Sequence, residues 1–251
     1  MTHNSIITIQ NVSKSYGSGS KAVHALQNVS LEIHEGEVIG LLGVNGAGKT
    51  TLSSILATLH PATSGDVLFH GQSIYKNLHN YRRALGFCPQ KANLDTFLTV
   101  RDNLIFAGRY FLMPEALIQS RADQLLAEFE LTRYRDFMVD QLSGGTQQRL
   151  LIARAIMHQP KIVIFDEPTV GLDPDIRRKL WDVIKGLKAE GITIILTTHY
   201  LDEAEYLSDR IALLHRGVLK LVAPVASLKE QYGIAKLEDL FLKIIGEYHA
   251  E

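Results

Sequence analysis

The sequence predicts an α/β fold in which one larger core carries a small antiparallel β subdomain and an inserted helical subdomain. On both sides of residues 91–157, short apolar runs bounded by turn residues alternate with helical patterns, which is typical of a parallel sheet covered by helices. Residues 91–157 are mainly helical in pattern, and two strand-like runs near the N-terminus precede the alternation. We therefore expect a single domain over 1–251, with the core at about 1–90 and 158–223 and a short helical tail at 224–251.

The composition is that of an ordinary globular protein with nearly balanced charge. Of 251 residues, 46% are hydrophobic, and 26 Lys and Arg stand against 27 Asp and Glu, so the net charge is -1. Nothing in this balance indicates a nucleic-acid partner or a polybasic membrane anchor. Cys88 is the only cysteine, which excludes a disulfide within the chain, favours a reducing compartment and is typical of a small buried residue.

Membrane-spanning and secretory signals are missing from the sequence as well. No apolar run approaches the roughly 20 residues that a spanning helix needs. Residues 1–5 lack the basic and apolar regions of a signal peptide. Any role at a membrane would therefore need partner subunits.

The β subdomain is predicted from the first 33 residues. Apolar residues alternate over 5–12 and recur over 22–33, and neither run is followed by a crossover helix. The two strands therefore indicate a small antiparallel sheet beside the core. Tyr16 is expected on the loop between them, either as an ordinary half-buried aromatic or as a platform for a purine ring.

Residues 43–50 match the phosphate-binding pattern G-x-x-x-x-G-K-[ST] without a gap. A buried strand is expected before them at 37–42, and a helix with one apolar face after them at 51–57. A glycine-rich turn with a chance lysine is the alternative, which the full match in this strand–loop–helix context disfavours. The candidate nucleotide-binding residues are Gly43, Val44, Asn45, Gly46, Ala47, Gly48, Lys49, Thr50 and Thr51.

The chemistry of this loop follows from its residue types. Glycines let the backbone bend around a polyphosphate so that successive N–H groups point inward, and the helix N-terminus adds positive potential. Lys49 can then reach the β- and γ-phosphates, and the Thr50 hydroxyl can ligate Mg²⁺. The sequence thus predicts a P-loop nucleoside triphosphatase core.

The middle of the chain is expected to form a helical subdomain inserted into this core. A strand ends at Cys88-Pro89-Gln90, because the proline favours an extended conformation before it. Ser143 is a good N-cap for a helix that carries apolar residues up to 157. The helices expected in between cover 100–104, 114–129 and 131–139.

The second half of the core repeats strands and helices. Strands are expected at 162–165 and 192–198, and helices at 176–187 and 201–207. Edge strands are expected at 211–214 and 218–221, and an amphipathic helix begins after residue 224.

Two carboxylates follow the strand at 162–165, where ligands bind in doubly wound sheets. Asp166 would hold Mg²⁺ through water, and Glu167 would polarise the water that attacks the γ-phosphate. The alternative is an acidic strand end that only caps the next turn. His199 also ends a strand, and a lone histidine there is more often a structural hydrogen-bonding group.

The order of these motifs resembles that of ATP-binding-cassette (ABC) ATPases over nearly the whole chain. The most specific is the Leu-Ser-Gly-Gly tetrapeptide at 142–145 ahead of the carboxylate strand, and Thr146 follows it where many members carry Gln or a large apolar residue. The shared segments are 43–50, Gln90, 142–145, 162–168, 171–173 and His199.

The resemblance implies a role for each matching residue. Tyr16 would stack on adenine, Gln90 would link Mg²⁺ and water to the helical lobe, and His199 would contact the γ-phosphate. Catalysis would thus involve Glu167, His199, Gln90 and Lys49, with ATP and Mg²⁺ bound and Thr50, Gln90 and Asp166 at the metal. Ser143, Gly144, Gly145 and Asp173 would meet the ATP held by the opposite protomer of a dimer.

The residues at 143–145 favour an assembly of two protomers on physical grounds. Ser143 with its two following glycines forms a second anion-binding helix end. Both helix ends can clamp one γ-phosphate only if the second belongs to another molecule or a distant surface. ATP would then hold the dimer closed, and hydrolysis would add charge repulsion that opens it.

Several segments resemble ABC-2 type exporters, which include daunorubicin-resistance and nodulation-factor export ATPases. These segments are 93–95, 98–104, 109–111, 197–205 and 237–242. This resemblance implies an export subunit at the cytoplasmic side of the cell membrane, bound to separate membrane-spanning permease subunits and to a second ATPase copy. The alternatives are the ATPase of an ABC importer, a soluble ABC protein acting on ribosomes or DNA, and a simple kinase. Importer ATPases often have a longer C-terminal domain, soluble members carry two cassettes or long insertions, and the 142–145 signature argues against a kinase.

Overall fold

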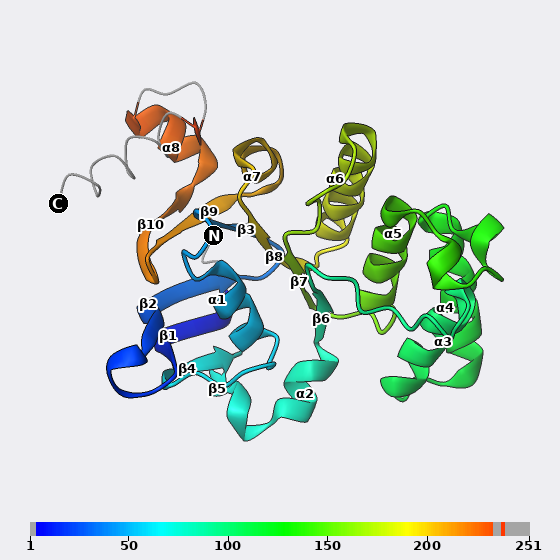
Figure 1. Ribbon diagram of the computed structural model, residues 1–251, viewed down its shortest axis with the longest axis horizontal. Coiled ribbons are helices and arrows are strands. Elements are labelled where there is room, and N and C mark those ends of the chain that lie inside the picture. Colours follow the sequence, from blue (N-terminus) through cyan, green and yellow to red (C-terminus); the bar gives the residue numbers. More distant parts are fainter. Residues whose placement is uncertain (1–3, 233–236, 239–251) are drawn as a thin grey trace.

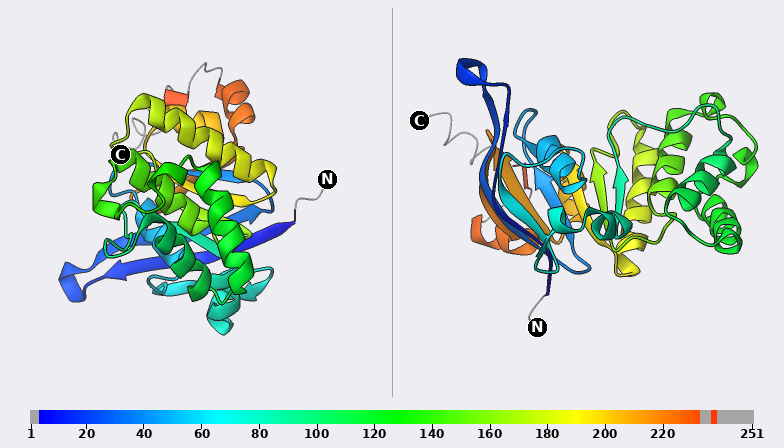
Figure 2. Two further views of the ribbon diagram at one scale, coloured as in Figure 1. Left: turned by 90° about the vertical axis from the view of Figure 1, so that its right-hand side faces the viewer. Right: turned by 90° about the horizontal axis from the view of Figure 1, so that it is seen from below.

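Two β-sheets and a cluster of helices make up the computed structural model, which describes residues 4–232 and 237–238 (Figure 1). One sheet is antiparallel and most of the other is parallel, so the expected α/β class is confirmed. The helices α3, α4 and α5 gather at one end of the molecule, and the antiparallel sheet lies at the other end (Figure 2).

The antiparallel sheet has the strand order β2-β1-β4-β5. Apolar residues of β1 and β2 form one core with Leu41 of the parallel sheet. Leu52 and Ile55 of α1, the helix that follows residues 43–48, belong to the same core. Tyr16 is the last residue of β1 and pairs with Val23, so the prediction that it lies on a loop is wrong. The strands are β1 (Ser5–Tyr16), β2 (Val23–His34), β4 (Ser64–Phe69) and β5 (Gln72–Ser73).

The second sheet has the order β10-β9-β3-β8-β7-β6. All neighbouring pairs are parallel except β9 with β10. The carboxyl ends of β3, β7 and β8 therefore lie side by side, and the chain segments that follow these three strands come together there. The strands are β3 (Val38–Leu42), β6 (Leu85–Cys88), β7 (Ile162–Asp166), β8 (Thr193–Thr198), β9 (Arg210–His215) and β10 (Val218–Pro224).

Strand β9 was expected at the edge of the sheet, and this prediction is wrong. It lies between β3 and β10, and residues 211–215 are all buried. The apolar run 211–214 is the signature of a strand covered on both faces. Of the two strands expected at the edge, only β10 lies there.

The helices near the core are α1 (Lys49–Leu56), α2 (Leu78–Arg83), α6 (Pro174–Ala189), α7 (Leu201–Leu207) and α8 (Val225–Tyr232). The inserted helices are α3 (Val100–Tyr110), α4 (Glu115–Glu128) and α5 (Gly144–Ala155). No helix within 4–232 and 237–238 has the length and apolarity needed to cross a membrane. Apart from α8 and 237–238, the expected tail lies outside the described residues.

The helix predicted at 131–139 does not form. Glu130, with φ +54°, ends the preceding helix, and only the short 3₁₀ turns Thr132–Tyr134 and Val139–Gln141 follow. The carbonyls of Arg135 and Phe137 instead accept the N–H groups of Arg101 and Val100 at the start of α3. Those N–H groups have no partner within α3, so the segment is stabilised as a cap for α3 and not as a helix.

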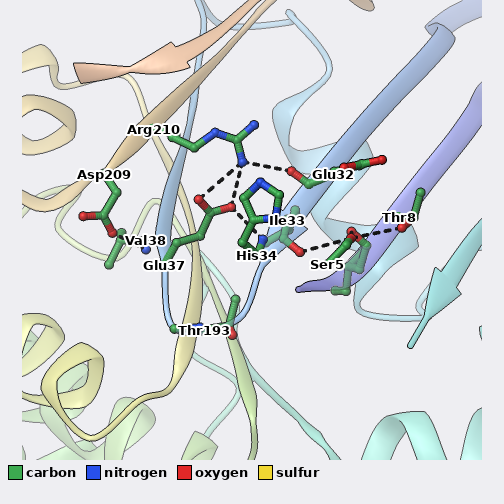
Figure 3. Close-up of polar contacts among 12 residues, drawn as sticks. Ser5, Thr8, Glu32, Ile33, His34, Glu37, Val38, Thr193, Asp209 and Arg210 are labelled. Atoms are coloured by element: carbon green, nitrogen blue, oxygen red, sulfur yellow. Dashed lines mark hydrogen bonds and ion pairs between the residues drawn. The ribbon is translucent and has the colours of Figure 1, made fainter. Parts of the chain in front are cut away.

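A polar network at the amino ends of the parallel strands joins the two sheets (Figure 3). The Glu37 carboxylate, 9% exposed, accepts Arg210 Nη1 at 2.9 Å and the His34 N–H at 2.8 Å. Arg210 also donates to the Glu32 carbonyl at 3.1 Å. One charged pair thus links the end of β2 to the starts of β3 and β9, at the edge opposite the phosphate loop.

Replacing Glu37 by alanine is expected to lower the free energy of unfolding by about 1–3 kcal/mol, because Arg210 loses its carboxylate partner and the His34 N–H loses its acceptor. Urea denaturation measures the change. The matched control is Glu32→Ala, since this exposed residue contributes only its backbone carbonyl. An equal loss in both variants would show that the ion pair contributes nothing of its own.

Candidate nucleotide site

The phosphate loop lies between β3 and α1, and its shape depends on two close backbone approaches. Gly48 has φ +106°, and a Cβ there would lie 2.7 Å from the carbonyl oxygen of Ala25. At Gly43 a Cβ would lie 2.4 Å from the carbonyl oxygen of Leu214. Any side chain at either position would push the loop away from the strands behind it.

A pocket of about 830 Å³ lies in front of this loop. Its lining comes from the phosphate loop, β2 and the ends of several core strands. Of the predicted nucleotide-binding residues, Gly43 and Ala47 are buried behind the loop and Val44 is exposed without lining the pocket. The predicted residues in the lining are Asn45, Gly46, Gly48, Lys49, Thr50, Thr51, Gln90, Glu167 and His199.

Four predicted catalytic residues meet at the Glu167 carboxylate. Gln90 Nε2 donates to Glu167 Oε2 at 3.0 Å. Lys49 Nζ lies 3.5 Å from Glu167 Oε1, and His199 Nδ1 lies 3.4 Å from Oε2. Lys49 also donates to the carbonyl oxygens of Gly43 and Val44. These groups come from four separate segments, so only the fold brings them together.

The backbone of Glu167 is held in an unusual conformation. Its φ is +50°, which costs of order 1–3 kcal/mol for a residue with a side chain. Its N–H group donates to the Thr197 hydroxyl at 2.9 Å and to the Thr197 carbonyl at 3.1 Å on β8. The neighbouring strand therefore sets the direction of the carboxylate.

Asp166 lies beside the pocket, buried under the end of β7. Its Oδ1 accepts the Thr197 hydroxyl at 2.6 Å. Burial raises the pKa of Asp166 above its usual range, while hydrogen bonds from Thr197 and Ser53 act against that rise. A cation beside this carboxylate would favour its charged form.

The oxygens around the pocket fit Mg²⁺. Thr50 offers a hydroxyl, Gln90 an amide oxygen and Asp166 a carboxylate, and Thr50 and Gln90 both line the pocket. Mg²⁺ prefers such oxygen ligands and takes only one or two carboxylates beside phosphates and water.

Tyr16 lies next to the pocket and outside its lining. It is 40% exposed, the Lys14 ammonium lies 5.1 Å from the ring centroid, and its ring is edge-on to that of His60. Its strand partner Val23 belongs to the pocket wall. The backbone of Tyr16 is therefore close to the site, while its ring contacts Lys14 and His60, and a role in stacking stays a prediction.

The predicted opposite-protomer residues lie apart from the pocket and close to each other. Ser143 is exposed and caps α5, since its Oγ accepts the Thr146 N–H at 3.3 Å and lies 2.9 Å from the Thr146 hydroxyl. Gly144 is exposed, and a Cβ on Gly145 would meet Ile176 of α6 at 3.0 Å. Asp173, also exposed, occupies the N-cap position of that helix without a side-chain capping hydrogen bond. Ser143, Gly144, Gly145 and Asp173 are together called the signature surface below.

The pocket also contains residues that the sequence reasoning missed. His24 and Gln27 of β2 and Arg216 line it, and Gln27 Nε2 donates to the Arg216 carbonyl at 3.1 Å. The only sequence signal at Arg216 is the turn Arg216-Gly217, and nothing local indicates that this turn reaches the phosphate loop. The Gly217 N–H, which donates to the Ala47 carbonyl, shows that it does.

The family model described as "ABC transporter" matches residues 26–170. That range contains the phosphate loop, Gln90, the 142–145 signature and both carboxylates. The chain belongs to the ABC transporter family.

A bacterial drug-resistance protein and a bacterial export protein are among the relatives of this ABC chain. It is 37% identical to the doxorubicin resistance ATP-binding protein DrrA of Mycobacterium tuberculosis, over 95% of the chain and 70% of that protein. It is 39% identical to the Nod factor export ATP-binding protein I of Rhizobium sp. (strain N33), over 92% and 75%. The expected resemblance to the ABC-2 export group is thus confirmed. Human ATP-binding cassette sub-family A member 13 is 42% identical over 90% of the chain, which spans only 4% of that protein.

Solved structures agree with the family. An ATP-binding subunit of an ABC transporter superposes with a TM-score of 0.86 at 29% identity, covering 96% of this chain and 99% of that one. A dimeric ATP-binding cassette in a post-hydrolysis state, bound to ADP and Pi, gives 0.79 at 32% identity, covering 87% and 98%. The ABC ATPase fold expected from the sequence is therefore confirmed.

Proposed function

We propose that this ABC protein hydrolyses ATP as a dimer on the cytoplasmic side of the cell membrane and drives export through separate membrane-spanning permease subunits. The observation that carries the proposal is the convergence of Lys49, Gln90 and His199 on Glu167 beside the phosphate loop. The names of DrrA and the Nod factor protein support export as the direction.

Each residue has a distinct task in the proposed reaction. Lys49 neutralises charge on the β- and γ-phosphates, and Glu167 orients the attacking water and accepts its proton. His199 holds the γ-phosphate, and Gln90 connects the water to the helical subdomain. Thr50, Gln90 and Asp166 would hold Mg²⁺, which supplies charge neutralisation when bound.

Dimerisation is proposed because no single chain completes the site. The signature surface is absent from the lining of the pocket in its own chain. A second copy placed face to face would bring Ser143 and its glycines to the γ-phosphate. The dimeric relative with ADP and Pi supports this arrangement.

The permease is proposed to dock beside the helical subdomain. Large apolar side chains are exposed there: Phe106 is 61% exposed, Tyr110 71% and Leu112 76%. Tyr110 and Leu112 line a groove of about 500 Å³ together with Arg82 and Arg83 of α2. Exposed aromatic and arginine side chains are the residues that anchor protein interfaces.

Crosslinking tests the export proposal. The full chain with a photo-crosslinker at Phe106 or Tyr110 is expressed in its native host. The crosslinker is expected to capture a membrane-spanning subunit. A crosslinker at Glu190, exposed where α6 ends, serves as the control and should capture none. Capture of a membrane subunit from Glu190 alone would contradict this docking surface, and capture of ribosomal proteins would favour a soluble function.

A further inference from the structure

Glu203 of α7 is a fully buried carboxyl that the proposed reaction does not use. It is 0% exposed, and its Oε1 accepts the Trp181 Nε1–H at 2.8 Å. Its Oε2 has no hydrogen-bond partner of ordinary geometry among the described residues, and neither does the buried hydroxyl of Thr169. An unpaired buried polar atom is destabilising, so two of them in one cluster call for an explanation.

The position of Glu203 links it to the hydrolytic residues. The hydroxyls of Thr198 and Thr169 lie close enough to influence its ionisation. Thr198 immediately precedes His199, and Thr169 follows Glu167 by two residues. Trp181 belongs to α6, and Asp173 immediately precedes that helix. The Glu203 carboxyl therefore lies close to three segments at once: the segment after β7, the end of β8, and α6.

No cation pairs with Glu203 in the part of the chain that the structure describes. The nearby Arg177 instead pairs with Asp202, at 3.2 Å. Burial raises the pKa of Glu203, and the Asp202 charge adds to the rise, while the Thr198, Trp181 and Thr169 hydrogen-bonding groups act against it. The groups that face it from α6, from the segment after β7 and from β8 are thus neutral donors or hydroxyls.

We propose that Glu203 is a positioning residue for ATP hydrolysis: its buried carboxyl ties together the segments that carry Glu167, His199 and Asp173. Oε1 accepts from Trp181, and a hydrogen bond between Oε2 and the Thr169 hydroxyl would satisfy both unpaired atoms. This inference rests on the proposed function, because it assigns Glu203 to the same reaction.

Such a residue acts on turnover and not on nucleotide affinity. Nothing places Glu203 in the lining of the pocket, so ATP contacts do not depend on it. Displacing Glu167 or His199 by about 1 Å, by contrast, can lower the rate about 100-fold. Glutamine copies the shape of the glutamate side chain and keeps one acceptor and one donor group.

The test compares Glu203→Ala, Glu203→Gln and Thr169→Val in the full-length protein. ATPase assays give kcat and KM, and thermal unfolding reports folding. Alanine and the Thr169 variant are expected to lower kcat about 10-fold to 100-fold with KM within about twofold, while glutamine stays within about threefold of wild type. Asp202→Ala, which removes an exposed acid from the same helix, is the control and should leave kcat unchanged.

Wild-type kcat in both folded Glu203→Ala and Thr169→Val would overturn the inference, even if the melting temperature falls, because the carboxyl would then be only structural. Equal losses in Glu203→Gln and Glu203→Ala would overturn the assignment of the effect to the hydrogen bonds of this side chain. If Glu203→Ala does not fold, Thr169→Val and Glu203→Gln decide the matter. Failure of the proposed function would give a different result. Wild type would then not hydrolyse ATP, or Glu167→Gln would hydrolyse it as fast as wild type.

Discussion

Replacing Glu167 by glutamine is expected to lower ATP turnover about 100-fold to 10,000-fold while ATP still binds, because the variant keeps the size and hydrogen bonding of the side chain but loses the base. Steady-state phosphate release measures turnover, and equilibrium binding measures affinity. Gln90 Nε2 can still donate to the amide oxygen that replaces Oε2. Glu128→Gln, on the exposed face of α4, is the matched control and should behave as wild type.

The same variant is expected to accumulate as a dimer with ATP, because hydrolysis no longer opens it. Light scattering with and without ATP measures the mass. Ser143→Arg should do the reverse, since a bulky cation would fill the place of the γ-phosphate, whereas Ser120→Arg on the exposed surface of α4 should not. A Glu167→Gln variant that stays monomeric at saturating ATP and also hydrolyses normally would contradict both the base and the dimer.

Lys49→Ala is expected to reduce ATPase activity about 100-fold to 1,000-fold, the effect of removing one preorganised group that stabilises transition-state charge. Lys49 is 4% exposed and lies over the phosphate loop, so its ammonium is already positioned before ATP arrives. Phosphate release by the purified protein, alone or with its permease, is the assay.

The control for this prediction is Lys76→Ala, an exposed lysine at the end of a 3₁₀ turn far from the loop in sequence. It should leave turnover unchanged. Near-normal turnover in Lys49→Ala would refute the assignment of this loop to ATP.

The sequence by itself determined the features that depend on local patterns. The phosphate loop was predictable because its strand, glycines and helix are consecutive, so their geometry needs no distant residue. The buried strands at 162–165 and 192–198, and the carboxylates after the first of them, follow from short apolar runs with polar ends. The Ser143 cap was predictable for the same reason, since its partner Thr146 is three residues away.

The tertiary structure alone decided which distant residues share a site and which local patterns fail. Residues 131–139 have helical spacing, yet their carbonyls cap α3, because a buried helix start must find acceptors elsewhere in the chain. The Arg216 turn reaches the pocket only because the parallel order of β3 and β9 places it beside the phosphate loop. The meeting of Lys49, Gln90 and His199 at Glu167 has the same origin: parallel strands end at one edge of a sheet, whatever their distance along the sequence.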